Sequence, residues 1–226
     1  MKPLLIVVCG DSSPRLPPEL GGYDRWFARI LDVPTHTADP RVGPLPDPSG
    51  YRGVVVSGST SGVHEELPWM RAAAAWLLAC DLPTLGVCFG HQLLAWAHGG
   101  VVRPATPEYG VHDVDRLEDD PLFEGLGDRF PVFECHFDAV VQLPENARVL
   151  AGNANAVQAL AFGPRVRSVQ FHPEFTPQVV ADALDRHQEA LEALVPGLPA
   201  RGRAGLREIP EATLILTNFL KYFVKD

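Results

Sequence analysis

A cysteine between two glycines is the residue of this chain best suited to act as a nucleophile. Residues 84–98 read TLGVCFGHQLLAWAH, in which a short apolar strand precedes Cys88 and a helix follows it. Gly86 and Gly90 complete the pattern G-x-C-x-G, a thiol version of the nucleophile elbow. Small neighbours suit a sharp strand-to-helix turn, because larger side chains would clash there. We therefore predict such a turn at Cys88.

The helix that follows would also favour the reactive form of this cysteine. Beginning near His91, it would direct free N–H groups and the positive end of its dipole towards the sulfur, and both favour the thiolate. An isolated G-x-C-x-G is equally compatible with a buried cysteine at an ordinary strand–helix joint. A nucleophilic role therefore requires a base elsewhere in the chain.

The segment SVQFHPE at 168–174 supplies a base. It follows an apolar stretch and places His172 just beyond its end, with Glu174 two residues later. The imidazole can take the thiol proton and return it to a leaving group, while the carboxylate orients the imidazole and stabilises its cation. Cys88, His172 and Glu174 are thus a candidate catalytic triad.

These two motifs together resemble those of the class I, triad-type glutamine amidotransferases. G-V-C-F-G-H-Q is followed some eighty residues later by H-P-E, and the resemblance runs from the first strand to Phe175. The chain is similar in particular to stand-alone members of this family, which include GMP-synthase-like amidotransferases and γ-glutamyl peptidase-like enzymes. The resemblance implies that Cys88 attacks the side-chain amide of glutamine, with His172 and Glu174 completing the triad.

The resemblance also implies an oxyanion hole and a substrate-holding glutamine. Gln92 matches the family's glutamine that helps to hold the substrate. The small-residue loop 57–62, SGSTSG, matches the family's glycine loop, so the backbone N–H groups of Gly58 and Phe89 are expected to hold the oxyanion. Ser59 adjoins this hole and is expected to contact the substrate. The loop lacks the lysine of a phosphate-binding P-loop, which argues against nucleotide binding.

The segment ECHFD at 134–138 matches a histidine-containing loop whose backbone contacts bound glutamine in the family. We therefore expect His136, Phe137 and Asp138 to bind the substrate. His136 is a second candidate for the base. That role is already assigned to His172, which has Glu174 to orient it. Cys135 lies beside it without further ligands at zinc-site spacing, so we expect neither a metal nor a cofactor.

Three functions remain open. In the first, the chain hydrolyses glutamine through a Cys88 thioester and releases glutamate and ammonia. Larger family members pass the ammonia to a synthase domain or subunit. Only about fifty residues follow H-P-E here, too few for a synthase domain, so either a separate acceptor protein exists or there is none.

The second function keeps the triad and changes the leaving group, so that the substrate is a γ-glutamyl peptide or γ-glutamyl amine. The third is a non-catalytic, amidotransferase-like binding subunit, although all three triad residues are present. Intracellular proteases and chaperones with the same sheet also carry an elbow cysteine, but H-P-E after a late strand is not their pattern.

Composition narrows the class of protein further. The 226 residues carry 19 basic and 28 acidic side chains, net −9, which argues against a nucleic-acid surface. No apolar run approaches the ~20 residues that span a membrane. The apolar N-terminal run lacks a small-residue cleavage site. The four cysteines are few and form no C-x-x-C pair, which favours a cytoplasmic location.

The strands and helices that we expect to position these residues indicate one α/β domain over residues 1–226. We expect a mostly parallel open sheet with helices on both faces, a flavodoxin-like fold resembling that of class I glutamine amidotransferases, with the site at the carboxyl ends of the strands. Strands are predicted at 4–9 and 54–56, and helices at 23–31, 68–80, 176–194 and 211–224. The helix at 23–31 is expected to pack in the core rather than to take part in function.

The connecting segments are predicted from composition. Four prolines at 37–50 indicate a surface connection, and 196–205 reads as a Pro/Gly/Arg loop. After Val101 short β-like segments alternate with turns and predict hairpins that continue the sheet. They lie at 111–117, 130–134, 139–143, 147–152, 157–162 and 166–171.

Overall fold

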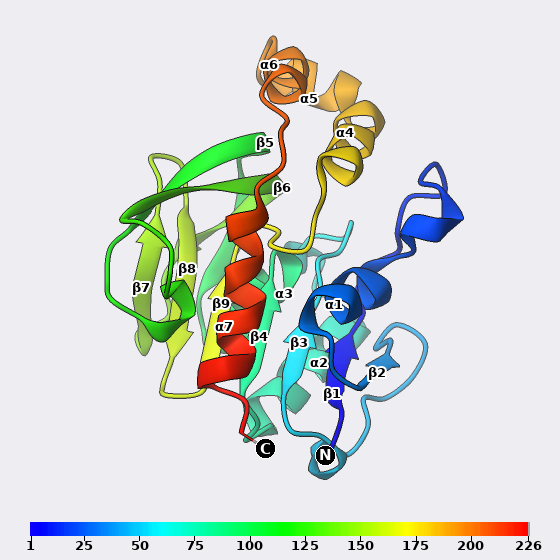
Figure 1. The fold of residues 1–226 in the computed structure, drawn as a ribbon, viewed down its shortest axis with the longest axis vertical. Coiled ribbons are helices and arrows are strands. Elements are labelled where there is room, and N and C mark those ends of the chain that lie inside the picture. The colour runs from blue at the N-terminus through cyan, green and yellow to red at the C-terminus, as the bar shows by residue number, and fades with distance from the viewer. Residues whose placement is uncertain (226) are drawn as a thin grey trace.

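The computed structural model describes residues 1–225, and these contain one nine-stranded mixed sheet in the order β2-β1-β3-β4-β9-β8-β7-β5-β6 (Figure 1). The first five strands in this order pair in parallel, and the rest pair antiparallel from β9 onwards. The strands are β1 (Leu4–Val7), β2 (Thr35–Ala38), β3 (Val54–Val56), β4 (Thr84–Val87), β5 (Val101–Arg116), β6 (Arg129–Gln142), β7 (Ala147–Gly152), β8 (Val157–Phe162) and β9 (Val166–Val169).

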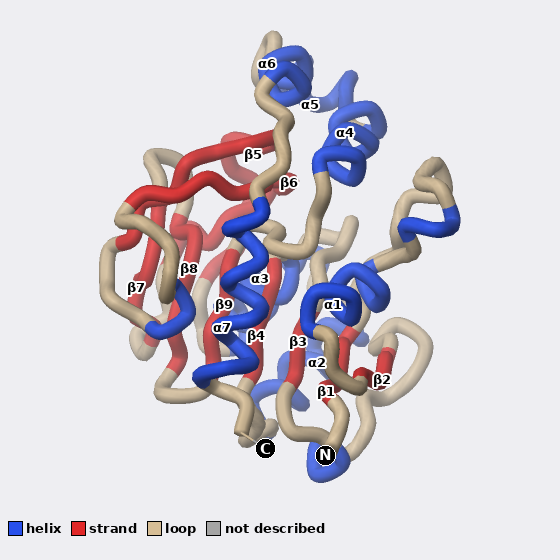
Figure 2. The backbone as a smooth tube through the Cα atoms, in the orientation of Figure 1, coloured by secondary structure: helices blue, strands red, loops and turns tan. Residues whose placement is uncertain are grey.

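Helices cover both faces of the parallel half. On one face α1 (Tyr23–Leu31) and α7 (Leu214–Tyr222) pack over Leu4 and Ile6; on the other, α2 (Pro68–Ala79) and α3 (Phe89–Ala97) pack over Leu5 and Val7 (Figures 1 and 2). Successive strand side chains point to opposite faces, so a strand buried on both sides is apolar at every position. The predicted open α/β sheet with helices on both faces is confirmed.

Several predicted elements have the expected bounds, and one strand was missed. The helix at 23–31 and the strand at 54–56 are α1 and β3, and α2 ends one residue before the predicted limit. The missed strand is β2, at the start of the segment predicted as a surface connection. Its sequence, THTA, is half exposed at the sheet edge, so it lacks the apolar run that marks a buried strand. Short 3₁₀ turns lie at Pro18–Leu20, Pro48–Gly50, Val63–Glu65, Pro121–Phe123 and Pro210–Thr213.

In the antiparallel half β7 and β8 have the predicted bounds, 147–152 and 157–162, whereas β5 and β6 depart from the prediction. Instead of short hairpins, β5 and β6 form a long two-stranded ribbon that includes residues 134–138, with a register shift between the pairs Pro104–Asp138 and Glu108–His136. The prediction of a loop there is wrong: His136 lies in β6 and pairs with Glu108 of β5. Glu134 and His136 are buried charged residues, so they interrupt the apolar pattern by which a sheet strand is normally recognised.

The C-terminal region forms three short helices that pack on this ribbon (Figure 1). The predicted helix at 176–194 is divided at His187 into α4 (Pro177–Arg186) and α5 (Gln188–Leu194). The predicted loop at 196–205 contains α6 (Leu198–Ala204), whose proline is tolerated in the first turn. The predicted last helix opens with a 3₁₀ turn before α7. Burial of apolar residues against the ribbon overrides the local composition here.

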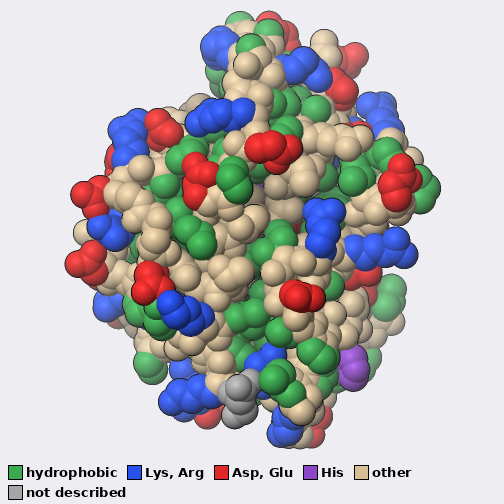
Figure 3. All heavy atoms as spheres, viewed as in Figure 1, with side chains coloured by type: hydrophobic (Ala, Val, Ile, Leu, Met, Phe, Trp, Pro, Cys, Tyr) green, Lys and Arg blue, Asp and Glu red, His purple; other side chains and the backbone are tan. Residues whose placement is uncertain are grey.

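The surface shows charges of both signs. On the face that carries α1 and α7, Lys and Arg side chains are interspersed with Asp and Glu (Figure 3). This face is therefore not the basic patch expected of a nucleic-acid surface. None of the helices in residues 1–225 has both the length and the apolar character to traverse a bilayer. All four cysteines are free thiols.

Candidate active site

Cys88 occupies a strained turn between β4 and α3. Its backbone has φ 52° and ψ −103°, a conformation that a residue with a side chain rarely adopts. A Cβ on Gly86 would lie 2.5 Å from the carbonyl oxygen of Gly90, and one on Gly90 would lie 2.4 Å from that of Val56. Both glycines are therefore required where the helix meets the sheet. The predicted sharp turn is confirmed.

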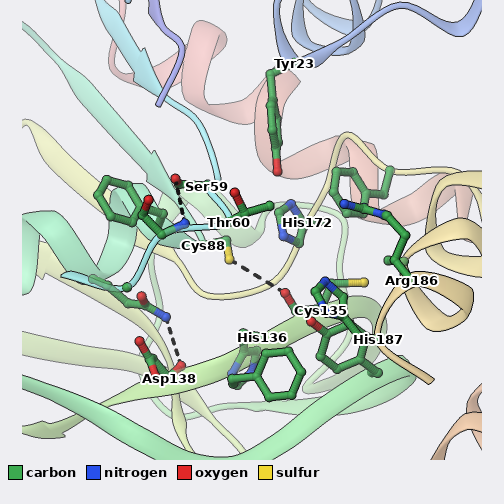
Figure 4. A pocket seen from close by; sticks show the side chains of 18 of the residues that line it. Tyr23, Ser59, Thr60, Cys88, Cys135, His136, Asp138, His172, Arg186 and His187 are labelled. Carbon is green, nitrogen blue, oxygen red and sulfur yellow. Dashed lines mark hydrogen bonds between the residues drawn. The ribbon is translucent and has the colours of Figure 1, made fainter. Parts of the chain in front are cut away.

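The turn places Cys88 in a cavity of about 270 Å³ (Figure 4). The cavity lies at the carboxyl ends of β3 and β4, the usual place for a ligand in an open α/β sheet. Most of the predicted site residues line it, namely Ser59, Cys88, Phe89, Gln92, His136, Phe137, Asp138 and His172. Gly58 and Glu174 are not in the lining, but Glu174 contacts His172, and Gly58 lies so close to it that an added Cβ would meet its ring. The structure thus brings all the predicted site residues together.

His172 is held by a buried carboxylate. Its Nδ1 lies 2.8 Å from Glu174 Oε1, and both side chains are at most 2 % exposed. Phe175 stacks on the imidazole at 3.8 Å between ring centres. Burial opposes protonation of His172, but the negative charges of Glu174 and Cys88 outweigh it and raise its pKa to about 10. The ring is thus fixed in orientation and suited to carry a proton beside the sulfur.

Gly58 lies where a side chain would collide with Tyr23 and His172. A Cβ there would come within 2.8 Å of the Tyr23 hydroxyl oxygen and 2.9 Å of His172 Cε1. The Ser57 hydroxyl donates to the Gly58 carbonyl at 2.8 Å and so fixes this stretch of backbone. Phe89 is the first residue of α3, where a backbone N–H has no partner inside the helix. The N–H groups of Gly58 and Phe89 are therefore candidates to hold an oxyanion.

Gln92 and Asp138 form a polar wall of the cavity. The Gln92 side-chain amide donates to the Asp138 carbonyl at 2.9 Å and to Gln170 Oε1 at 3.1 Å. Its own Oε1 is left to accept a hydrogen bond from a ligand. The Asp138 carboxylate lies 2.9 Å from His64 Nδ1. This wall offers acceptors to a substrate amino group.

His136 lies between two buried carboxylates. Its Nε2 is 3.3 Å from Glu108 Oε2 and 3.2 Å from Glu134 Oε2. Burial opposes protonation of His136, but its interactions with Glu108 and Glu134 raise its pKa to about 10. Burial raises the pKa of Glu134, whereas interactions with His112 and His136 lower that of Glu108 despite burial. The charge of His136 is therefore balanced beneath the cavity.

The carboxylate of Glu108 is held from the opposite side as well. Three side-chain amides donate to it at 2.7 to 3.1 Å, those of Asn153, Asn155 and Gln158. Glu108 thus ties the long ribbon to the β7–β8 hairpin. Residues 134–138 are thus part of the sheet, and His136 among them faces the Glu108 carboxylate.

Comparison with known proteins agrees with this geometry. Residues 30–186 match the family model described as glutamine amidotransferase class-I, which is more than half of the chain. The chain belongs to the class I glutamine amidotransferase family. A glutamine amidotransferase structure from Thermotoga maritima superposes with a TM-score of 0.74 at 21 % identity, covering all of both chains. At this low sequence identity the superposition shows only that the two proteins share a fold.

Two members of the family are similar to this chain in sequence. A glutamine-hydrolysing GMP synthase subunit from Saccharolobus solfataricus is 40 % identical over 150 residues, which are 65 % of this chain and 77 % of that protein. Gamma-glutamyl peptidase 4 from Arabidopsis thaliana is 31 % identical over 189 residues, 74 % of this chain and 73 % of that protein. The two relatives are thus named for different activities.

The cavity includes residues that the sequence did not single out. Tyr23 lines it from the start of α1, a helix that otherwise packs in the core as expected. Phe175, Arg186 and His187 line it from the C-terminal region. One signal for Tyr23 was available, because α1 begins at the carboxyl edge of the sheet, where ligands bind. Arg186 and His187 had none, since their position depends on how α4 packs on the distant strands β5 and β6.

Proposed function

We propose that this chain hydrolyses a γ-glutamyl amide through a Cys88 thioester, with glutamine as the simplest substrate. The observation that carries the proposal is the contact of His172 with Glu174 at 2.8 Å, beside a cysteine held in a nucleophile elbow. Membership of the glutamine amidotransferase family supports the same chemistry. A buried, oriented imidazole next to a cysteine is the arrangement that activates a thiol nucleophile.

The reaction proceeds in two halves. In the first, Cys88 Sγ attacks the amide carbonyl carbon, and the N–H groups of Gly58 and Phe89 hold the oxyanion. The C–N bond breaks as His172 gives its proton to the departing nitrogen. In the second half, water attacks the thioester carbonyl with His172 as base, and glutamate leaves as the thiol reforms.

The polar wall receives the glutamyl part of the substrate. Gln92 Oε1 and the Asp138 carboxylate accept from the α-amino group, while Ser59 and the backbone of residues 136–138 complete the binding surface. His136 keeps that backbone in place through Glu108 and Glu134. In this proposal His136 positions the substrate and does not act as the base.

The fate of the leaving nitrogen divides two versions of the proposal. If ammonia leaves, a separate synthetase subunit would consume it, and the Saccharolobus solfataricus relative is itself named as one subunit of a GMP synthase. If an amine or amino acid leaves, no acceptor is needed, and the Arabidopsis thaliana relative is named a peptidase of that kind. A non-catalytic binding subunit is the remaining alternative.

Glutamate release by the purified chain and by its Cys88→Ala variant tests the proposal. The substrates are glutamine and a panel of γ-glutamyl dipeptides. We expect turnover by the wild-type chain that disappears in the variant. Equal turnover in both would rule out the cysteine mechanism, and binding without turnover of any substrate would favour the non-catalytic alternative.

A further inference from the structure

One wall of the cavity carries a cation that glutamine hydrolysis does not require. Among the Lys and Arg side chains of residues 1–225, Arg186 at the end of α4 is the one that lines the cavity. Tyr23 and Phe175 line the same region, and their ring centres are 6.2 Å apart. The cavity therefore has a mixed aromatic and cationic wall beyond the triad.

Arg186 is held with part of its guanidinium available. Its Nε donates to Asp182 Oδ2 at 2.8 Å, one helical turn earlier, and its side chain is 27 % exposed. No acceptor within residues 1–225 is paired with its two terminal nitrogens. Its positive charge acts to lower the pKa of Tyr23 and of Cys135, against the larger effect of burial, so it reaches into the site. An Arg fork fixed in this way can bind a carboxylate with two hydrogen bonds.

The position of Arg186 relative to the triad indicates which part of a substrate it meets. Figure 4 shows Asp138 on one side of Cys88, and His172 and Arg186 on the other. Because His172 must reach the departing nitrogen to protonate it, the leaving group has to lie on the His172 side. The glutamyl part then extends towards Gln92 and Asp138. Arg186 thus faces the leaving group rather than the glutamyl carboxylate.

We propose that Arg186 binds a carboxylate of the leaving group, so that the preferred substrates are γ-glutamyl amino acids or short γ-glutamyl peptides. The inference rests on the proposed thioester chemistry and specifies its substrate class. The amide C–N bond breaks as the Cys88 thioester forms, and the amino acid departs with the proton from His172. Ammonia has no group that could use Arg186, and a nearby cation would disfavour the ammonium ion. Tyr23 and Phe175 provide contact area for the leaving amino acid.

Three substrates separate the possible roles of Arg186. γ-Glutamylglycine carries the leaving-group carboxylate, γ-glutamylglycinamide lacks its charge, and glutamine lacks the whole group. The measured quantity is kcat/KM for glutamate release, because all three substrates form the same thioester and share its hydrolysis. Wild-type, Arg186→Gln and Arg186→Lys chains are compared. The matched control is Arg203→Gln. Arg203 of α6 pairs with Asp185 of α4, the helix that also carries Arg186, but it does not line the cavity.

For the wild-type chain we expect kcat/KM for γ-glutamylglycine to exceed that for γ-glutamylglycinamide by roughly 10- to 100-fold, the usual range for hydrogen bonds to a charged group. Arg186→Gln should abolish this preference and leave glutamine turnover within about threefold of wild type, within the usual context scatter of such contributions. Arg186→Lys should keep part of the preference, because it retains the charge without the fork. Arg203→Gln should match the wild type.

Two results overturn the inference while leaving the proposed function intact. In one, the chain hydrolyses the acid and the amide equally well. In the other, Arg186→Gln slows all three substrates by the same factor, which would assign Arg186 to the glutamyl carboxylate.

Calorimetric binding of γ-glutamylglycine and of its amide to the Cys88→Ala chain provides a readout independent of turnover. Equal affinities there also overturn the inference, whereas absence of both binding and turnover overturns the proposed function with it.

Discussion

Two buried imidazoles line the same cavity, and each faces carboxylates. His172 has one nitrogen 2.8 Å from Glu174, and the charge of Cys88 also acts on its ring. His136 has a single nitrogen within 3.3 Å of both Glu108 and Glu134. Both imidazoles have a pKa raised to about 10, so protonation alone does not tell them apart.

The difference lies in where each proton can go. One nitrogen of His172 is used by Glu174, which leaves the other for the sulfur and the leaving group. The charge of His136 is shared between two carboxylates behind the cavity, and Glu108 is in turn tied to the β7–β8 hairpin. A raised pKa therefore marks a catalytic proton only where the geometry also offers an acceptor at the reacting atoms. On this account His172 is catalytic and His136 positions the strand.

The largest difference between the two histidines should appear in activity. His172→Gln removes the proton donor and base, and we expect kcat/KM to fall by roughly 10²- to 10⁴-fold, the usual contribution of such a group. His98→Gln is the control, because His98 stacks on Phe162 outside the cavity lining. Steady-state glutamate release measures both. Activity of His172→Gln within a few-fold of wild type would remove His172 from the mechanism.

The second prediction concerns the pH profile. Glu174 raises the pKa of His172, so Glu174→Gln should lower that pKa. The protonated imidazole would then be lost at lower pH, and the basic limb of kcat/KM should move down by roughly 1 to 3 pH units. Glu134→Gln, beside the other histidine, should leave the limb in place. A limb that moves with Glu134→Gln and not with Glu174→Gln would exchange the roles of the two imidazoles.

For His136 we expect the main loss in stability. His136→Gln removes the buried imidazole that both Glu108 and Glu134 face, which should lower the free energy of unfolding by about 3 kcal/mol. Activity of the folded fraction should stay within roughly tenfold of wild type, as for a positioning residue. Chemical denaturation measures the loss, and adding Glu108→Gln should restore part of it. A His136→Gln chain that is as stable as wild type but inactive would indicate that His136 is the base.

The last prediction concerns the pH dependence of stability. Both imidazoles have a folded-state pKa of about 10 against 6.5 as the reference, so the folded state binds more protons between these values. Their stabilisation should be complete below pH 6.5 and should be lost as the pH rises through 10, at no more than about 1.4 kcal/mol per pH unit for each group. Denaturation midpoints across this window measure it. Stability that rises over the same window would contradict both assignments.

The sequence predicted those parts of the site that depend on local spacing. G-x-C-x-G indicates a tight turn, because a Cβ at Gly86 or Gly90 would lie only 2.4 to 2.5 Å from backbone atoms. The two glycines make this requirement visible in the sequence. H-P-E places His172 and Glu174 two residues apart, so their contact is almost local. Together with the resemblance to a family, these motifs were enough to predict the parallel sheet and the candidate triad.

The rest of the site depends on contacts between distant segments. Glu134 and His136 read as a polar loop because their partners, Glu108 among them, lie on another strand. Arg186 reaches the cavity because α4, at whose end it lies, packs on β5 and β6 of the ribbon. Neither the pairing register nor the break between α4 and α5 has a local signature, so neither could be predicted from composition or periodicity.

The central claim is that a γ-glutamyl group is carried on Cys88, and trapping that thioester tests it most directly. The chain is mixed with glutamine or γ-glutamylglycine, quenched in acid during turnover and analysed by intact-protein and peptide mass spectrometry. We predict a mass gain of one γ-glutamyl group on the peptide that contains Cys88, and none in the Cys88→Ala chain. Glutamate release by the wild-type chain without an adduct at any time, or undiminished release by Cys88→Ala, would contradict the account.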